Sequence, residues 1–80
     1  MKARVHVFLK PGVLDPQGQA IEKALHGLGF DGVAEVRQGK FFDIALIADD
    51  EAAAKQQLDA MSRKLLANTV IESFSIALVS

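Results

Sequence analysis

The chain has 80 residues, half of them hydrophobic, a formal net charge of −1 and no cysteine. This length allows one small domain over residues 1–80, with a core so small that association with another chain is expected. The balanced charge disfavours nucleic acid as a partner, and the lack of cysteine excludes disulfides and thiol chemistry. There is no signal-peptide pattern and no apolar run of about 18 residues, so we expect a cytoplasmic protein without a membrane partner.

The first half of the chain predicts a strand, a helix and a second strand. Polar and apolar residues alternate from Lys2 to Lys10, the period of a strand, and Pro11-Gly12 ends it. Asp15-Pro16 places a capping carboxylate and an N1 proline at a helix start, and apolar residues follow at helical spacing as far as Gly29. The β-branched residues within Gly32 to Gln38 predict a short second strand.

The second half predicts two more strands with a helix between them. A hairpin turn near Gly39 leads into an apolar strand from Phe41 to Ala48. Asp49-Asp50 cap a helix that ends near Asn68, and alternation from Val70 to Val79 predicts the last strand. The order β-α-β-β-α-β predicts an α+β, ferredoxin-like sandwich: a four-stranded antiparallel sheet with two helices on one face.

The sheet face that the helices leave open is predicted to be unusually apolar. If Val5 and Val7 point to the helices, His6 and Phe8 point away from them. An apolar patch of a few hundred Å² is typical of an interaction site, although a one-residue error in register would invert a face. The predicted oligomer interface consists of His6, Phe8, Phe41, Ile47, Ala77 and Val79.

No side chain is predicted to carry chemistry. The two histidines, His6 and His26, lack a carboxylate or hydroxyl partner at motif spacing, and no serine lies in a Gly-x-Ser-x-Gly turn. The acidic run from Asp49 to Glu51 is explained more simply by helix capping than by a bound cation. Gly27 and Gly29 end a helix, whereas a phosphate-binding loop opens one. We therefore expect no catalytic residue, no metal site and no cofactor bound by this chain.

Three stretches carry a family resemblance. Phe8 to Gly18, Val36 to Lys40 and Leu65 to Glu72 resemble the LKPGVLDPQG, VRxGK and LLANPVIE motifs of PurS, the family of small subunits of bacterial phosphoribosylformylglycinamidine (FGAM) synthase. Thr69 stands where the family usually has proline, and Phe41-Phe42 is bulkier than the usual pair. The resemblance covers nearly the whole chain.

The resemblance implies a non-catalytic accessory subunit in purine biosynthesis. In that family a glutaminase subunit releases ammonia from glutamine, and a large synthetase subunit uses ATP, with magnesium, to form the amidine. The small subunit, a dimer or tetramer with itself, bridges these two partners and assists ammonia transfer. The alternatives are a small-molecule-binding regulatory module of the same fold, an RNA-binding domain and an independent enzyme.

A loop and a hairpin are the hypothesised contact surface for those partners. Val13 and Leu14 are apolar residues in a loop where polar residues are the norm, and Arg37 and Lys40 offer positive charge. The competing explanations are that the loop residues are needed only to shape the loop, and that the two positive charges are simply solvated. The predicted partner-binding residues are Lys10, Pro11, Gly12, Val13, Leu14, Asp15, Arg37, Gly39 and Lys40.

Overall fold

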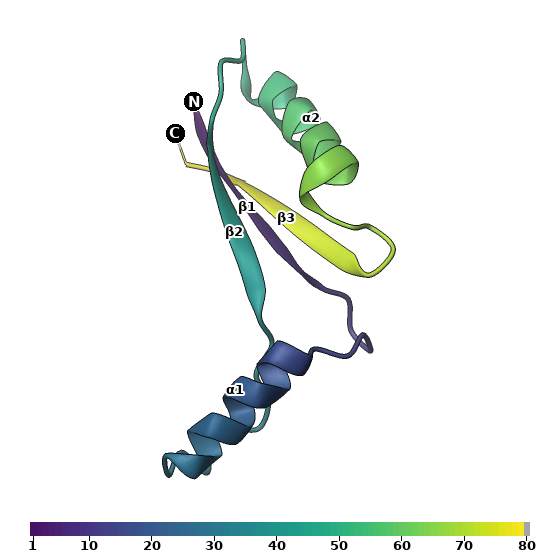
Figure 1. Ribbon diagram of the computed structural model, residues 1–80. Coiled ribbons are helices and arrows are strands. Elements are labelled where there is room, and N and C mark those ends of the chain that lie inside the picture. The colour runs from purple at the N-terminus through teal and green to yellow at the C-terminus, as the bar shows by residue number, and fades with distance from the viewer. Residues whose placement is uncertain (80) are drawn as a thin grey trace.

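The computed structural model describes residues 1–79 and has an α+β fold with three strands and two helices (Figure 1). The elements in chain order are β1 (Lys2–Leu9), α1 (Pro16–Gly27), β2 (Gly39–Ala45), α2 (Glu51–Met61), the π-helical turn η1 (Ser62–Leu66) and β3 (Glu72–Leu78). None of the helices described in residues 1–79 has the length and apolar character needed to cross a membrane.

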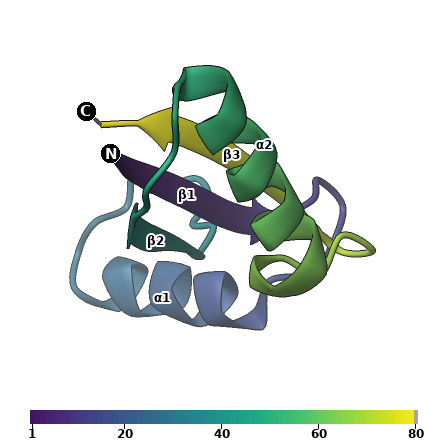
Figure 2. The same cartoon turned by 90° about the horizontal axis from the view of Figure 1, so that it is seen from above.

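The sheet is antiparallel with strand order β2-β1-β3. Val5 lies opposite Phe42 on β2 and Ile76 on β3, and directly opposite residues share a face of an antiparallel sheet. This pairing confirms the predicted strand register. The start of β1 and the end of β3 lie side by side at one end of the sheet, where the Val79 N–H donates to the Lys2 carbonyl at 2.8 Å (Figures 1 and 2).

The core lies between the sheet and α2. Asp50 caps α2 by accepting from the Ala53 N–H at 2.8 Å, which starts the helix where the acidic pair predicts it. The helix then buries Leu58 completely in one cluster with Val5 and Val7 of the central strand. The cluster is small, which fits the limited stabilisation expected of an 80-residue chain.

The predicted fourth strand, from Gly32 to Gln38, is not formed in the single chain. These residues pair with no strand within residues 1–79, and the chain passes into β2 at Gly39 without the predicted hairpin turn. The segment instead returns along α1, where the His26 ring nitrogen Nε2 lies 2.7 Å from the Val33 carbonyl oxygen. The sheet therefore has three strands, because the residues expected to form the fourth lie beyond its end.

The prediction that both helices cover one face of the sheet holds only for α2. In Figure 1, α1 extends away from the end of the sheet, and its only buried residue is Gly18. Ile21 and Leu28 remain 41% and 74% exposed. The radius of gyration is 15.9 Å, against about 12 Å for a compact domain of this length. Within residues 1–79, the amphipathic helix α1 thus does not pack on the sheet.

Candidate functional site

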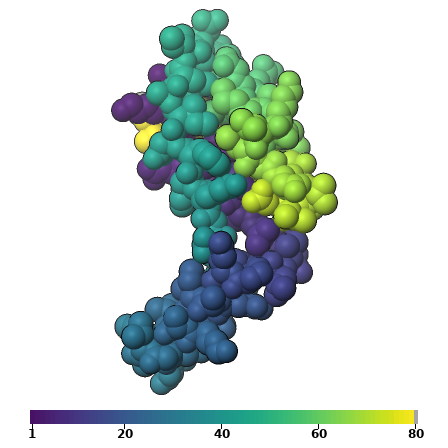
Figure 3. Space-filling view, viewed as in Figure 1, coloured from purple at the N-terminus to yellow at the C-terminus, as the bar shows by residue number. Residues whose placement is uncertain are grey.

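The neck is the narrow connection between the sheet and α1, visible in Figure 3 as a constriction between two lobes. We define it as residues 10–18 and 36–38. Asp15 is its centre: Oδ1 accepts from the Gly18 N–H at 2.9 Å, and Oδ2 accepts from the Gln38 N–H at 2.7 Å. Asp15 is only 5% exposed. One carboxylate therefore caps α1 and also ties the helix to the chain that enters β2.

The same contacts set the charge state of Asp15. The N–H groups of Gln38 and Gly18, and then the positive charge of Arg37, lower the pKa of the Asp15 carboxyl below its ordinary value. A carboxyl with a lowered folded-state pKa contributes stability above its unfolded pKa of about 3.9. That contribution is lost as the pH falls through the folded pKa, so the neck keeps its charged centre at neutral pH.

The predicted partner-binding residues divide between the neck and β2. Arg37 donates from Nη2 to the Lys10 carbonyl at 3.3 Å, which joins the two sides of the neck a second time. Leu14 is 65% exposed beside the buried Asp15, and Gly12 adopts a φ of 87° that favours glycine. The other members of the set are Pro11 and Val13 in the loop and Gly39 and Lys40 at the start of β2.

The open face of the sheet carries an aromatic cluster. His6 stacks on Phe41 with ring centroids 4.4 Å apart and an interplanar angle of 13°, and it lies 4.9 Å from Phe8. The Arg4 guanidinium lies over the Phe41 ring, 5.6 Å from its centroid, and pairs with the Asp43 carboxylate at 2.8 Å. Both members of that pair are exposed, so the pair adds little to stability.

The remaining residues of the predicted oligomer interface extend this face. Ala77 lies opposite Arg4 in the register, on the same face as the aromatic cluster. Ile47 and Val79 follow the ends of β2 and β3 and are 97% and 52% exposed. An apolar surface of this kind is typical of interaction sites.

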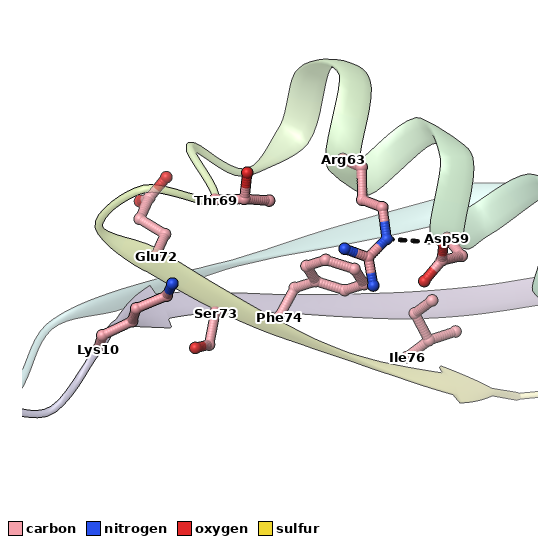
Figure 4. A pocket seen from close by; sticks show the side chains of 8 residues that line it. All are labelled: Lys10, Asp59, Arg63, Thr69, Glu72, Ser73, Phe74 and Ile76. Atoms are coloured by element: carbon pink, nitrogen blue, oxygen red, sulfur yellow. Dashed lines mark hydrogen bonds and ion pairs between the residues drawn. The ribbon is translucent and has the colours of Figure 1, made fainter.

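An open groove of about 510 Å³ runs between α2 and β3 (Figure 4). Arg63 pairs with Asp59 at 2.9 Å and holds its guanidinium 5.3 Å from the Phe74 ring centroid. Lys10 and Glu72 lie toward the other end of the groove. Its charges are mixed and Arg63 is engaged within the chain, which makes the groove a poor match for a small anion.

The described residues bring together no catalytic constellation. His6 stacks on Phe41 and also contacts the tilted Phe8 ring, and His26 faces a backbone carbonyl, so neither histidine has a carboxylate partner among its described contacts. Residues 1–79 contain no group of three or more histidine, cysteine, aspartate or glutamate side chains placed to hold a metal. Sequence reasoning missed Gln38. This residue contributes to the neck through its backbone N–H, which does not depend on the side chain, so the residue type does not indicate the contact.

Comparison with known proteins agrees with the three sequence motifs. The family model PurS, phosphoribosylformylglycinamidine (FGAM) synthase, matches residues 2–80. The PurS subunit of Synechocystis is 55% identical over 89% of this chain and 71% of its own length. The Methanocaldococcus jannaschii subunit is 44% identical over 94% of this chain and 90% of its own length.

Solved structures agree in fold as well. Crystalline PurS of Methanocaldococcus jannaschii superposes with a TM-score of 0.85 at 43% identity, covering 95% of this chain and 92% of that one. A chain in the structure of PurLQS from Thermotoga maritima gives a TM-score of 0.88 at 26% identity, covering 95% of this chain and 93% of that one. The motifs, the family model and the shared fold all lead to one conclusion: the chain belongs to the PurS family of FGAM synthase subunits.

Proposed function

We propose that this chain is a non-catalytic, cytoplasmic accessory subunit that bridges a glutaminase subunit and an ATP-dependent synthetase subunit of FGAM synthase and assists ammonia transfer between them. The observation that carries the proposal is the family match over residues 2–80, together with the likeness to a chain of PurLQS. ATP and magnesium belong to the synthetase partner. Open surfaces without a catalytic constellation suit a subunit that works by contact.

Reconstitution tests this function. We expect the purified chain, mixed with the glutaminase and synthetase subunits, to be required for glutamine-dependent amidine formation. Ammonium chloride in place of glutamine supplies the matched control, because the synthetase then receives ammonia without a bridge and the chain becomes dispensable. Equal glutamine-dependent rates with and without the chain would contradict the proposed role.

The contact with these partners is made by the exposed part of the neck loop and the start of β2. Leu14 offers an apolar side chain to a partner, and Lys40 and Lys10 offer positive charge for acidic groups. Asp15 is too deeply buried to reach a partner and contributes by shaping the loop.

A second copy of the chain covers the exposed face of α1. Ile21, Ala24 and Leu28 line one side of this helix, and Phe42 and Ile44 of β2 are only half-buried on the α2 side of the sheet. Both surfaces are apolar and each lacks the cover that a ferredoxin-like fold would provide. Burial removes apolar area from water at a gain of roughly 25 cal/mol per Å².

Exchange between two chains completes the fold predicted from the sequence. Segment 33–38 of one chain adds to the free edge of β2 in the other, and α1 lies beside α2 of that chain, giving four strands with two helices on one face. Exchange of identical elements is a common route to dimers, and it also covers an exposed strand edge. The open faces of two such dimers then associate through the aromatic cluster to give a tetramer.

Charge placed on the open face tests the tetramer. We expect Val79→Lys, and likewise Ile47→Lys, to lower the mass in solution measured by light scattering, because each places a charge within a buried apolar contact. Circular dichroism should stay unchanged. Val70→Lys is the matched control, since Val70 is 80% exposed in the turn before β3 and away from this face. An unchanged mass for both open-face variants would contradict the interface.

A further inference from the structure

The neck contains hydrogen bonds that connect the start of α1 to the entry to β2. The two carboxylate oxygens of Asp15 accept hydrogen bonds from different segments. Oδ1 accepts from the Gly18 N–H at the helix start, and Oδ2 accepts from the Gln38 N–H at the entry to β2. The Asp15 carbonyl also accepts from the Gln19 N–H at 3.0 Å. One residue thus touches both chain segments that join the helix to the sheet.

Gly18 makes this connection close. A Cβ built on Gly18 would lie 2.2 Å from the Val36 carbonyl oxygen and 2.8 Å from Asp15 Oδ2. Real side chains do not tolerate such distances, so only glycine lets the first turn of α1 approach the returning segment. We call the contact of Asp15 and Gly18 with residues 36–38 the clasp.

Among the described residues, the other short side-chain contact of α1 with the returning segment joins the His26 ring to the Val33 carbonyl at 2.7 Å. It lies near the end of the helix that is far from the sheet, so it ties the helix to this segment and not to the sheet. Gly18 is the only buried residue of α1, and within residues 1–79 the helix does not pack on the sheet. The second link across the neck, from Arg37 to the Lys10 carbonyl, is a longer hydrogen bond of 3.3 Å at an exposed site. Rigid presentation of a binding element raises affinity, because less conformational entropy is lost on association.

We propose that Asp15 is a positioning residue whose clasp holds α1 at a fixed angle to the sheet and thereby presents the helix to the second copy of the chain. This inference rests on the self-association proposed above. The clasp acts as a joint between the two parts of the chain, in addition to capping the helix. Its loss leaves α1 folded and lets its direction vary.

Two substitutions distinguish the effect of the clasp on the direction of α1 from the N-capping of that helix. Asp15→Asn keeps a good N-cap residue, but its amide has one acceptor oxygen where the carboxylate has two, so the N–H of Gln38 meets an NH₂ group. Gly18→Ala keeps the carboxylate and favours the helix, but it forces the first turn away from Val36. Both variants are expected to retain their helical circular dichroism.

The controls are matched in chemistry. Asp50→Asn alters the N-cap of α2, whose carboxylate accepts from Ala53 and has no bond to a second segment within the described residues. Gly27→Ala makes the same change as Gly18→Ala at the other end of α1, where a Cβ meets nothing within 4 Å.

The direction of α1 is the decisive measurement. The chain has no cysteine, so spin labels attach only to cysteines introduced at Lys23 on α1 and Lys55 on α2, both exposed. Dilution with unlabelled chain restricts the measured distance to one molecule, and the Leu28→Lys background removes the second copy as a support. We expect one narrow distance distribution for the unmodified clasp and both controls, and a broadened one for Asp15→Asn and Gly18→Ala.

Self-association provides the second readout. We expect the dissociation constant between copies to rise by about tenfold in Asp15→Asn, the loss of one hydrogen bond to a charged group, and to stay unchanged in Asp50→Asn. A narrow, unshifted distance distribution in both clasp variants would overturn the inference. If the unmodified chain is monomeric at every concentration, the proposed self-association fails, and the label distance alone still decides whether the clasp exists.

Discussion

Leu28→Lys is expected to separate the two chains of the dimer that exchanges α1. Leu28 is 74% exposed at the end of α1, on the same side of the helix as Ile21. In a symmetric dimer the substitution occurs twice, and each copy loses an apolar contact and brings a charge toward an apolar surface. We expect the dimer to weaken by roughly 3 kcal/mol or more, above about a hundredfold in the dissociation constant. Sedimentation over a concentration series measures it.

Gln19→Lys is the matched control for this substitution. It adds the same charge to the same helix, but Gln19 lies on the opposite side from Ile21 and Leu28. We expect the Gln19→Lys chain to sediment like the unmodified one. Dimers of equal strength in both variants would show that α1 does not contact the second copy, and the exchange of elements between chains would then be wrong.

The strands and caps could be predicted because their signals are local. Alternation identified β1 and assigned Val5 to the core face, and the pairing of Val5 with Phe42 and Ile76 confirms it. Asp15 and Asp50 each cap a helix, as expected of aspartate before a helical pattern. These features depend on a few neighbouring residues, so a single sequence contains the information needed.

The position of α1 could not be predicted, because helical periodicity shows that a face is apolar but not what covers it. Ile21 and Leu28 fit a helix packed on its own sheet as well as one packed on a second copy. The segment from Gly32 to Gln38 has the composition of a strand, but a strand also needs a partner, and within residues 1–79 this segment pairs with none. The wrong placement of α1 and the wrong fourth strand therefore have one physical cause: the sequence pattern does not say which surface covers an element.

The contacts within the neck could not be predicted for a different reason. The bond from Gln38 to Asp15 joins positions 23 residues apart through a backbone N–H, which every residue except proline possesses. The family motifs include Asp15 and Gly18, and the sequence alone explains Asp15 as a helix-start residue. Only the structure reveals that Gly18 also permits the close approach to Val36.

Leu58→Ala is expected to unfold most of the protein as an isolated chain. Leu58 is fully buried and is among the largest side chains in the core cluster beneath α2. Truncation of a buried leucine to alanine costs about 2–5 kcal/mol, comparable to the roughly 3–5 kcal/mol that a single core of this size supplies. Urea unfolding followed by circular dichroism should therefore show a midpoint shifted to very low denaturant or no folded baseline.

Leu65→Ala makes the same chemical change seven positions further on, in η1, where the side chain is 84% exposed. Little apolar area is lost from the core, so its free energy of unfolding should stay within about 0.5 kcal/mol of the unmodified value. Because self-association adds stability by mass action, both variants are compared at one protein concentration. If Leu58→Ala unfolds no more easily than Leu65→Ala, stability resides in the contacts between copies, and the α2 core is only a minor contributor.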